Sequence, residues 1–445
     1  MKRRTLLAGA SALGLVSQAP AYAQATGRTR VVFWHALSGV LGEEVNRTCA
    51  AFNASQTETE IVPVFKGTYA ETLTGAIAAW RAGQAPHLVQ MFEVGTGSML
   101  AAGPAVKPTW QLIEETGVAI DPAAYIGAVK GYYSLPDGRL ASMPFNSSTA
   151  VMWLNADAFE KAGLDASKPP ATWPEVIAAA QAIKAKSAAE TPVTTSWFAW
   201  IQLEQFAAMH NVPFATKANG FEGLDTELRL NTAPFVKQLT RIMDMAKEGT
   251  FRYAGRDNAP DPVFVSGQAG IGFMSSGSRG DIAKNAKFKW VEAPLPYDPE
   301  LTTTPINSVI GGASLWTMTA PNRTPAEFKG VAQFLAYIAQ PKVDAEWHQR
   351  TGYVPVTLGG YEESKRQGFY EKNAGADVPI QQLTRGTVTE NSKGFRLGRM
   401  PEIRNIVYEE VERALQGQQT AQAALDSVVT RGNRVLREFE RANKT

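Results

Sequence analysis

Two strand patterns enclose a helix pattern near the start of this chain, and this arrangement constrains the fold most strongly. Residues 31–37 form an apolar run rich in β-branched and aromatic residues, apolar positions recur at helical spacing over 41–52, and residues 61–65 return to strand character. Residues 69–82 favour a second helix before a buried-strand run at 88–92. Strands joined by crossover helices pair in parallel, so we expect a mostly parallel sheet covered by helices.

The rest of the chain predicts a second region of the same kind. Strand-like residues 150–154 follow a polar turn and open this region. A chain of 445 residues also exceeds what one core usually serves, so we expect an α/β protein with two lobes. The further segments are helical patterns at 173–185, 234–247 and 325–340, strand-like runs at 269–274 and 308–318, a helix that starts near Pro401 and ends just before Gly417, and a last helix over 421–443.

The first 23 residues have the pattern of an export signal. Lys2, Arg3 and Arg4 form a basic start, residues 6–16 are apolar and uncharged, and residues 21–23 form a small-x-small cleavage site. The apolar run is too short to span a bilayer, which needs roughly 20 residues, and no later stretch is long and uncharged enough. The paired arginines leave the general secretory route and the twin-arginine route both open.

Cysteine and charge narrow the location and the class of partner. The only cysteine, Cys49, lies on the apolar stripe of the first predicted helix, where a core thiol is expected, and no cysteine is placed to carry a lipid anchor. We therefore predict a periplasmic protein that is not lipid-anchored. The formal net charge is +2 and three cations lie in the export signal, so no basic field remains for a nucleic acid or a membrane surface.

Sequence motifs of catalysis are missing. The four histidines, His35, His87, His210 and His348, lie far from one another and from the single cysteine, so a zinc or copper site is not expected. No nucleophile elbow, phosphate loop or dinucleotide fingerprint occurs. We expect no enzyme, no catalytic residue, no metal and no cofactor, although paired carboxylates from distant segments leave a hydrolase as an alternative.

Two segments suggest the wall and one end of a binding cleft. Trp197 and Trp200 lie three residues apart and form either a core stripe or an aromatic wall against the C–H faces of a polyol. Residues 275–278, Ser-Ser-Gly-Ser, come between a strand-like run and a helical stretch. Their hydroxyl and backbone N–H groups either bind an anion at a helix start or simply cap the helix through Ser275.

Two charged residues stand where their charge is unusual. Arg404 lies in the first turn of the helix that starts near Pro401, where a cation is disfavoured unless an anion also lies there. Lys393, Arg396 and Arg399 precede it, so the alternative is a solvated charge run. Glu93 ends an otherwise apolar strand, where its carboxylate either accepts hydrogen bonds from two ligand hydroxyls or caps the following turn.

Read in order, motifs along nearly the whole mature chain resemble the glycerol-3-phosphate-binding branch of the extracellular solute-binding proteins of ABC importers, a family that includes maltose-binding proteins. Each motif alone is weak and the set is specific. The motifs are Phe33-Trp34-His35, Lys66-Gly67-x-Tyr69, Glu93-Val94-Gly95-Thr96, Pro144 to Thr149, Ser275 to Ser278, Ile310 to Trp316, Glu346 to Gln349, Thr351-Gly352-Tyr353, Gln367 to Asn373 and Met400-Pro401-x-Ile403-Arg404.

The resemblance implies a set of ligand contacts. A phosphate offers only acceptor oxygens, so the guanidinium of Arg404, hydroxyls and a glycine N–H are expected to hold it. Glu93 is expected at the opposite end, on the glycerol hydroxyls, because phosphate would repel a carboxylate. The implied contacts are Tyr69, Glu93, Ser148, Ser275, Gly312, Tyr353 and Arg404, with Trp197 and Trp200 as the aromatic wall.

The resemblance also implies a two-lobed periplasmic-binding-protein fold with the ligand between the lobes. Residues 24–146 with 308–360 form lobe 1 and residues 147–307 with 361–445 form lobe 2. The chain crosses near 146–149, 306–312 and 358–364, and ligand favours the closed state. The implied partners are sn-glycerol 3-phosphate and inner-membrane permease subunits with their cytoplasmic ATPase, and a monomer is expected.

Departures from the family pattern leave the ligand partly open. Met152-Trp153 stands where relatives tend to have tyrosines, and residues 375–389 match poorly. Glycerophosphodiesters such as glycerophosphocholine are an alternative ligand, because a choline head can lie on Trp197 or Trp200. An uncharged sugar is a second alternative, although a buried Arg404 without an anionic partner would argue against it.

Overall fold

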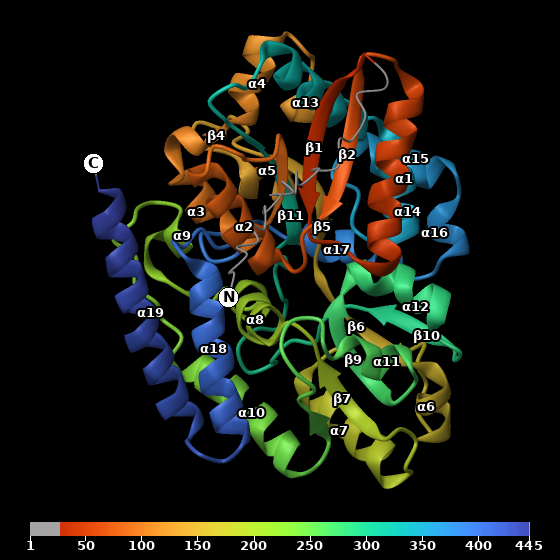
Figure 1. Cartoon of the computed structure of the whole chain (residues 1–445). Coiled ribbons are helices and arrows are strands. Elements are labelled where there is room, and N and C mark those ends of the chain that lie inside the picture. Colours follow the sequence, from red (N-terminus) through yellow and green to blue (C-terminus); the bar gives the residue numbers. More distant parts are fainter. Residues whose placement is uncertain (1–26, 445) are drawn as a thin grey trace, which may run out of the picture.

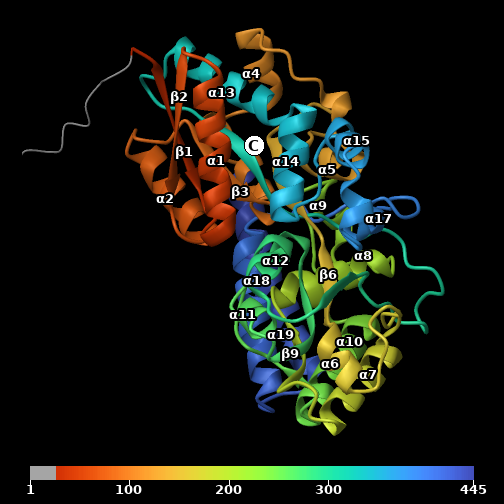
Figure 2. The same cartoon turned by 90° about the vertical axis from the view of Figure 1, so that its right-hand side faces the viewer.

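The computed structural model describes residues 27–444, and the predicted export signal lies outside them. Two lobes, each built on one β-sheet, lie one above the other (Figures 1 and 2). The predicted two-lobed α/β fold is thus confirmed. No helix within these residues is long and apolar enough to cross a membrane.

The first lobe holds a six-stranded sheet in the order β2-β1-β3-β11-β4, with β5 also paired to β11. Its strands are β1 (Thr29–His35), β2 (Thr59–Phe65), β3 (Leu88–Phe92), β4 (Val106–Lys107), β5 (Met143–Ser148) and β11 (Gly311–Met318). Its helices are α1 (Gly39–Ser55), α2 (Tyr69–Arg81), α3 (Thr96–Leu100), α4 (Thr109–Thr116), α5 (Gly127–Tyr133), α13 (Pro325–Ile338), α14 (Pro341–Thr351), α15 (Leu358–Arg366) and α16 (Phe369–Lys372).

The second lobe holds a five-stranded sheet in the order β10-β6-β9-β7-β8. Its strands are β6 (Ala150–Asn155), β7 (Thr191–Thr195), β8 (Phe251–Arg252), β9 (Ala269–Ser275) and β10 (Trp290–Ala293). Its helices are α6 (Ala156–Lys161), α7 (Trp173–Ala185), α8 (Gln205–Met209), α9 (Thr216–Gly220), α10 (Ala233–Lys247), α11 (Asp261–Val265), α12 (Arg279–Asn285), α18 (Met400–Leu415) and α19 (Ala421–Asn443), while α17 (Val378–Leu383) lies between the lobes.

Both sheets are mixed rather than mostly parallel. β1 runs parallel to β2 and β3, as the βαβ pattern predicts, but β11 runs antiparallel to β3, β4 and β5. In the second sheet β7 runs parallel to β8 and β9, whereas β6 runs antiparallel to β9 and β10. The antiparallel strands β5, β6 and β11 lie next to the crossings between the lobes, so the return path sets their direction rather than a crossover helix.

Local sequence rules account for the start of three long helices. Helices α2, α7 and α13 each begin at a capping box, in which an N-cap threonine accepts from the backbone N–H of a glutamate three residues on and that glutamate accepts from the threonine N–H. Thr68 and Glu71 form the box of α2, which fixes Tyr69 as the first helical residue. Cys49 is buried in α1 as predicted, and burial raises the pKa of its thiol.

The chain crosses between the lobes at two of the three predicted places. β5 leads directly into β6 through Thr149, and the second crossing enters β11 at Gly311. The third crossing lies later than predicted: α15 packs on α14, and the Thr357 N–H donates to the carboxylate of Asp344 at 2.8 Å. The predicted boundary at 360/361 is therefore wrong, because this hydrogen bond and the packing on α14 hold α15 in the first lobe.

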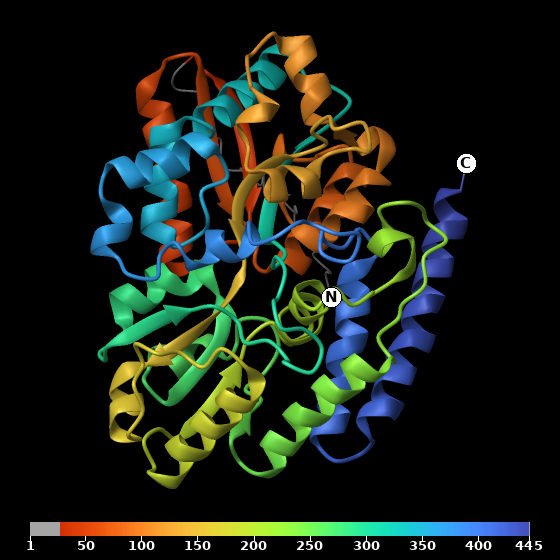
Figure 3. The ribbon, with the colours of Figure 1, turned by 180° about the vertical axis from the view of Figure 1, so that it is seen from behind.

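The last crossing follows α16. Gln382 of α17 donates to the Ala150 carbonyl of β6 at 3.0 Å, while Ile380 and Leu383 of the same helix pack in the core of the first lobe, so α17 contacts both lobes. Residues 384–399 then run between the lobes to α18 (Figure 3). This path brings the start of α18 against the end of β3, and it positions the charged part of the site.

Candidate functional site

The crossing strands bring three of the expected ligand residues into one seam between the lobes. Ser148, the last residue of β5, lies in register with the first residue of β11, next to Gly312. Ser275, the last residue of β9, lies in register with the first residue of β6. The N–H of Ser276 donates to the carbonyl of Thr149, in the crossing itself, at 2.9 Å. These pairings join the two lobes at their hinge side.

Two consecutive glycines allow the backbone of β11 to pass through this crowded seam. Gly312 has a φ of +83°, and a Cβ atom there would lie 1.8 Å from the carbonyl oxygen of Asn146. A Cβ atom on Gly311 would lie 2.3 Å from the ring of Trp200. Glycine is therefore required at both positions, and it leaves the main chain open to close approach by a ligand.

Two tyrosines of the first lobe meet at the side chain of Asn146. The Nδ2 atom of Asn146 donates to the hydroxyl oxygen of Tyr69 at 2.9 Å, and the Tyr69 ring stacks on Phe92 with centroids 5.3 Å apart. Tyr353 follows α14, and its ring stacks with Trp347 at 6.1 Å. Burial raises the pKa of Tyr353 to about 12. The Tyr353 hydroxyl therefore keeps its proton at neutral pH and can donate it in a hydrogen bond.

Tyr353 also reaches the second lobe. A Cβ atom on Gly277 would lie 2.9 Å from the Tyr353 ring, so the tyrosine packs directly on the turn that follows β9. In that turn the Ser275 hydroxyl accepts from the Gly277 N–H at 3.1 Å. The helix-capping interpretation of Ser275 is thus confirmed, and the same cap places Ser275 beside Tyr353.

The aromatic pair lies on a backbone of unusual conformation. Trp197 is half-buried with a φ of +45°, and its N–H donates to the carbonyl of Asp257 at 2.7 Å. A π-helical turn, η4 (Ala199–Glu204), follows and holds Trp200, whose buried Nε1 has no hydrogen-bond partner in the described part of the chain. Left-handed non-glycine residues and π-helical turns cluster at functional sites. Both features support the ligand-wall interpretation.

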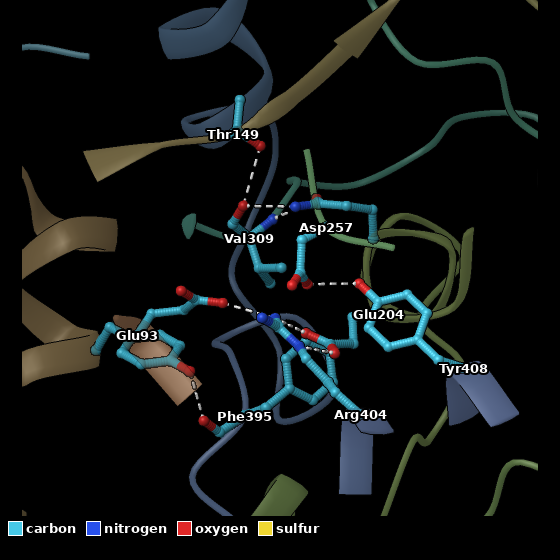
Figure 4. A network of polar contacts seen from close by, with 10 residues as sticks. Glu93, Thr149, Glu204, Asp257, Val309, Phe395, Arg404 and Tyr408 are labelled. Atoms are coloured by element: carbon cyan, nitrogen blue, oxygen red, sulfur yellow. Dashed lines mark hydrogen bonds and ion pairs between the residues drawn. The ribbon is translucent and has the colours of Figure 1, made fainter. Parts of the chain in front are cut away.

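Arg404 lies between two buried carboxylates (Figure 4). Its Nε and Nη2 atoms donate to the two carboxylate oxygens of Glu204 at 2.8 and 2.7 Å. The Nη2 atom also donates to the carboxylate of Glu93 at 2.6 Å. Glu93 belongs to the first lobe, while Arg404 and Glu204 belong to the second. The pair of Arg404 with Glu93 therefore joins the two lobes, and the pair of Arg404 with Glu204 lies within the second lobe.

The triad contradicts the expected separation of Glu93 from Arg404. The two side chains are direct neighbours, because the last crossing brings α18 against the end of β3. Burial alone would lower the pKa of the Arg404 guanidinium, but Glu204 and Glu93 raise it well above its ordinary value. Burial raises the pKa of Glu93, and Arg404 offsets part of that effect.

The triad also removes an argument against an uncharged sugar. A buried guanidinium was expected to need an anionic ligand, but Glu93 and Glu204 already supply two anionic partners. The capping alternative for Glu93 is wrong too, since its carboxylate binds Arg404 and no side chain caps the turn at Glu93–Gly95. The burial of Arg404 is therefore compatible with a sugar ligand as well as with a phosphate.

Three site residues were missed in the sequence. Glu204 is an acid in an apolar segment, the same signal that singled out Glu93. Asn146 belongs to the polar turn already noted, but its contact with Tyr69 depends on a segment 77 residues away. Asp261 starts a short helix and looks like an ordinary cap; in the structure its Oδ2 accepts from the Ser278 hydroxyl at 3.1 Å, and its buried Oδ1 has no partner among residues 27–444.

Asp261 predicts a pH dependence of stability. Burial raises the pKa of Asp261 from 3.8 to about 7, although the nearby hydroxyls of Ser196 and Ser278 lower it. A raised pKa in the folded state means that the contribution of Asp261 to folding stability is fully present below about pH 4 and is lost as the pH rises through about 7. Between pH 5 and pH 8, the free energy of unfolding of wild type should therefore fall by on the order of 2 kcal/mol relative to that of Asp261→Asn.

Urea unfolding of both proteins at several pH values measures this gap. Asp157→Asn, which removes an exposed carboxylate, is the matched control and should show no such trend. If the difference in free energy of unfolding between wild type and Asp261→Asn stayed constant from pH 5 to pH 8, the Asp261 carboxylate would be as well solvated as that of Asp157.

The remaining charged candidates take no part in the triad. Arg399 pairs with Glu402 and Glu438, Lys393 lies 3.9 Å from Glu222, and Arg396 binds backbone carbonyls, so only Arg404 of this run joins the site. Burial lowers the pKa of each of the four histidines. In the described range no group of three or more His, Cys, Asp or Glu side chains is placed to hold a metal ion.

Comparison with known proteins agrees with this architecture. UgpB, the sn-glycerol-3-phosphate-binding periplasmic protein of Pectobacterium atrosepticum, is 44% identical over 424 residues, which cover 95% of this chain and 94% of that protein. The protein of the same name from Rhizobium meliloti is 44% identical over 413 residues, or 93% of this chain and 95% of that protein.

Solved structures share the two-lobed fold. UgpB from Mycobacterium tuberculosis in complex with glycerophosphocholine superposes with a TM-score of 0.76 at 19% identity, over 93% of this chain and 99% of that one. The cyclic alpha-maltosyl-1,6-maltose binding protein from Arthrobacter globiformis superposes with a TM-score of 0.72 at 22% identity, over 93% of this chain and 100% of that one. The family model for bacterial extracellular solute-binding proteins matches residues 47–374. This chain therefore belongs to the bacterial extracellular solute-binding protein family.

Proposed function

We propose that this chain is the periplasmic solute-binding component of an ABC importer and that it binds sn-glycerol 3-phosphate between its lobes. Relatives 44% identical over nearly the full length carry that ligand in their names. The observation that carries the proposal is the chemistry of two groups of side chains between the lobes. One is a carboxylate-rich ion triad, and the other gathers hydroxyl and backbone donors.

The triad end suits the glycerol hydroxyls. Glu93, Glu204 and Arg404 together carry one net negative charge, so a phosphate group placed there would meet repulsion. A glycerol hydroxyl can donate to a carboxylate oxygen and accept from the guanidinium, which matches the triad without adding charge. Arg404 then acts by holding the two carboxylates in position, rather than as the phosphate ligand expected from the sequence.

The opposite end suits the phosphate. Ser148, Ser275 and Gly312 lie in the seam, and Tyr353 packs against the turn after Ser275. Hydroxyl and N–H donors are what phosphate oxygens require. Asp261 lies nearby through Ser278, and its raised pKa keeps part of it neutral at pH 7. We therefore expect phosphate binding to weaken as the pH rises above 7 and Asp261 ionises.

Between these ends, Trp197 and Trp200 form the wall for the carbon chain. Their ring faces exclude water from the C–H groups of a short polyol. A choline head could use the same faces, so glycerophosphocholine is the second candidate ligand.

Ligand contacts drawn from both lobes imply that binding stabilises the closed state. We propose that the closed monomer delivers its ligand to inner-membrane permease subunits, which are driven by a cytoplasmic ATPase. Transport needs no chemical step by this chain, so the proposal assigns it no catalytic residue.

Calorimetric titration of the mature protein tests the proposal, after ligand is stripped by unfolding and refolding. We expect one-to-one binding of sn-glycerol 3-phosphate, weakened about tenfold or more by Tyr353→Phe, since a hydrogen bond to a charged group contributes about 1.5–3 kcal/mol. Tyr361→Phe, in α15, is the matched control and should bind like wild type.

The other ligands of the series decide between the alternatives. Binding of glycerophosphocholine with comparable affinity would extend the ligand class to diesters. Binding of maltose alone would make the chain a sugar carrier. Hydrolysis of a glycerophosphodiester, detected as released product, would support the hydrolase alternative instead.

A further inference from the structure

A cavity lies at the hinge, and it shares none of the residues assigned to the cleft ligand. Its volume is about 440 Å³, within the range of roughly 300–1,000 Å³ usual for small-molecule sites. Its walls come from α5 in the first lobe, Phe221 and Glu222 in the second, the crossing at 307–310, and Lys393 and Arg396 in the last crossing. We call it the hinge cavity.

Arg396 in this cavity lacks an anionic partner among residues 27–444. Its Nη2 atom donates to the carbonyl oxygens of Tyr132 at 2.6 Å and Ser134 at 2.9 Å, while its buried Nε has no partner. Burial lowers the pKa of Arg396 to about 10, so the side chain stays charged at neutral pH. This contrasts with Arg404, whose guanidinium binds two carboxylates.

A second cation and an aromatic ring stand beside Arg396. The Arg396 guanidinium carbon lies 4.1 Å from the centroid of the Phe221 ring, and Lys393 Nζ lies 5.0 Å from it. The only acid within ion-pair distance of Lys393 in the described part of the chain is Glu222, at 3.9 Å, with a largely solvated side chain. The cavity therefore has excess positive charge next to an apolar surface.

We propose that the hinge cavity binds a small organic anion, whose carboxylate or phosphate group lies between Arg396 and Lys393 and whose carbon skeleton packs on Phe221. Partly buried guanidinium groups bind such anions through short, charge-assisted hydrogen bonds. The hydrogen bonds of the guanidinium to backbone carbonyls use only Nη2, which leaves Nη1 as a donor for the anion.

An occupant here is coupled to the ligand cleft by geometry. It contacts both lobes and two of the segments that join them, so it binds the open and closed arrangements with different affinity. Thermodynamic linkage makes this coupling reciprocal. The anion in the hinge cavity changes the affinity for the cleft ligand by some factor, and the cleft ligand changes the affinity for the anion by the same factor.

Titration of inorganic phosphate, and separately of citrate, into protein holding about one equivalent of sn-glycerol 3-phosphate tests this inference, which rests on the proposed function in this one respect. The two probes distinguish a phosphate site from a carboxylate site. We expect one-to-one binding of at least one probe, weakened about tenfold or more by Arg396→Gln. Arg399→Gln is the matched control, because Arg399 already pairs with Glu402 and Glu438, and it should leave the affinity unchanged.

Two further measurements keep the test decisive if Arg396→Gln fails to fold. Lys393→Gln changes a side chain that is 31% exposed and should fold normally, yet weaken probe binding severalfold. Hydrogen exchange should slow in segments 127–136 and 388–396 when the probe is added. Failure of both probes to bind at millimolar concentration, or binding that neither substitution changes, would overturn the inference. Because these substitutions lie away from the residues assigned to the cleft ligand, failure of this inference can be told apart from failure of the proposed function.

Discussion

Arg404→Ala should abolish tight ligand binding and lower the free energy of unfolding by about 3–5 kcal/mol, the range for removing one partner of a buried ion pair. The substitution leaves Glu93 and Glu204 buried without their cation, since both carboxylates accept hydrogen bonds from the guanidinium. It also removes an ion pair that joins the first lobe to α18. Denaturant unfolding and calorimetric titration of the same preparation measure both effects.

Arg413→Ala, on the same helix, is the matched control. The Arg413 side chain is 53% exposed, and its partner Glu410 also binds Arg431. Glu410 is buried but keeps Arg431 and Gln419 as partners, so removal of the exposed Arg413 should change stability by only about 0–1 kcal/mol and ligand affinity not at all. Equal losses of stability in the two variants would contradict a buried triad at Arg404.

Gly312→Ala should have a comparably large effect for a steric reason. Its φ of +83° costs a residue with a Cβ atom about 1–2 kcal/mol, and the new atom would lie 1.8 Å from the Asn146 carbonyl oxygen. Backbone atoms must move to relieve this overlap, in the seam where β5 and β11 pair. We expect a loss of at least about 3 kcal/mol in the free energy of unfolding and loss of ligand binding.

Gly417→Ala separates the two causes. Gly417, just after α18, has a φ of +76°, and nothing lies within 4 Å of a Cβ atom placed there. Only the backbone cost of about 1–2 kcal/mol remains, and ligand binding should not change. If Gly312→Ala were no less stable than Gly417→Ala, the backbone of the seam would be able to move away from the new Cβ atom without loss of stability.

Most of the secondary structure could be predicted because it depends on neighbours in the chain. The pattern at 173–185 coincides with α7, and the predicted last helix coincides with α19. Helix periodicity, capping boxes and buried-strand runs act over fewer than about 15 residues, so they can be read from local sequence. The boundary near 360 failed because packing of α15 on α14, rather than a local signal, keeps that segment in the first lobe.

By itself, the sequence determined the elements, the two-lobed α/β class and the residue types that a polar ligand would need. Only the tertiary structure decided which of these residues meet. Arg404 pairs with Glu204 across 200 residues of chain and with Glu93 across 311, and no spacing rule reaches so far. Those contacts turn Arg404 from an expected phosphate ligand into the centre of an ion triad, because a buried guanidinium takes the partners that the crossing segments bring to it.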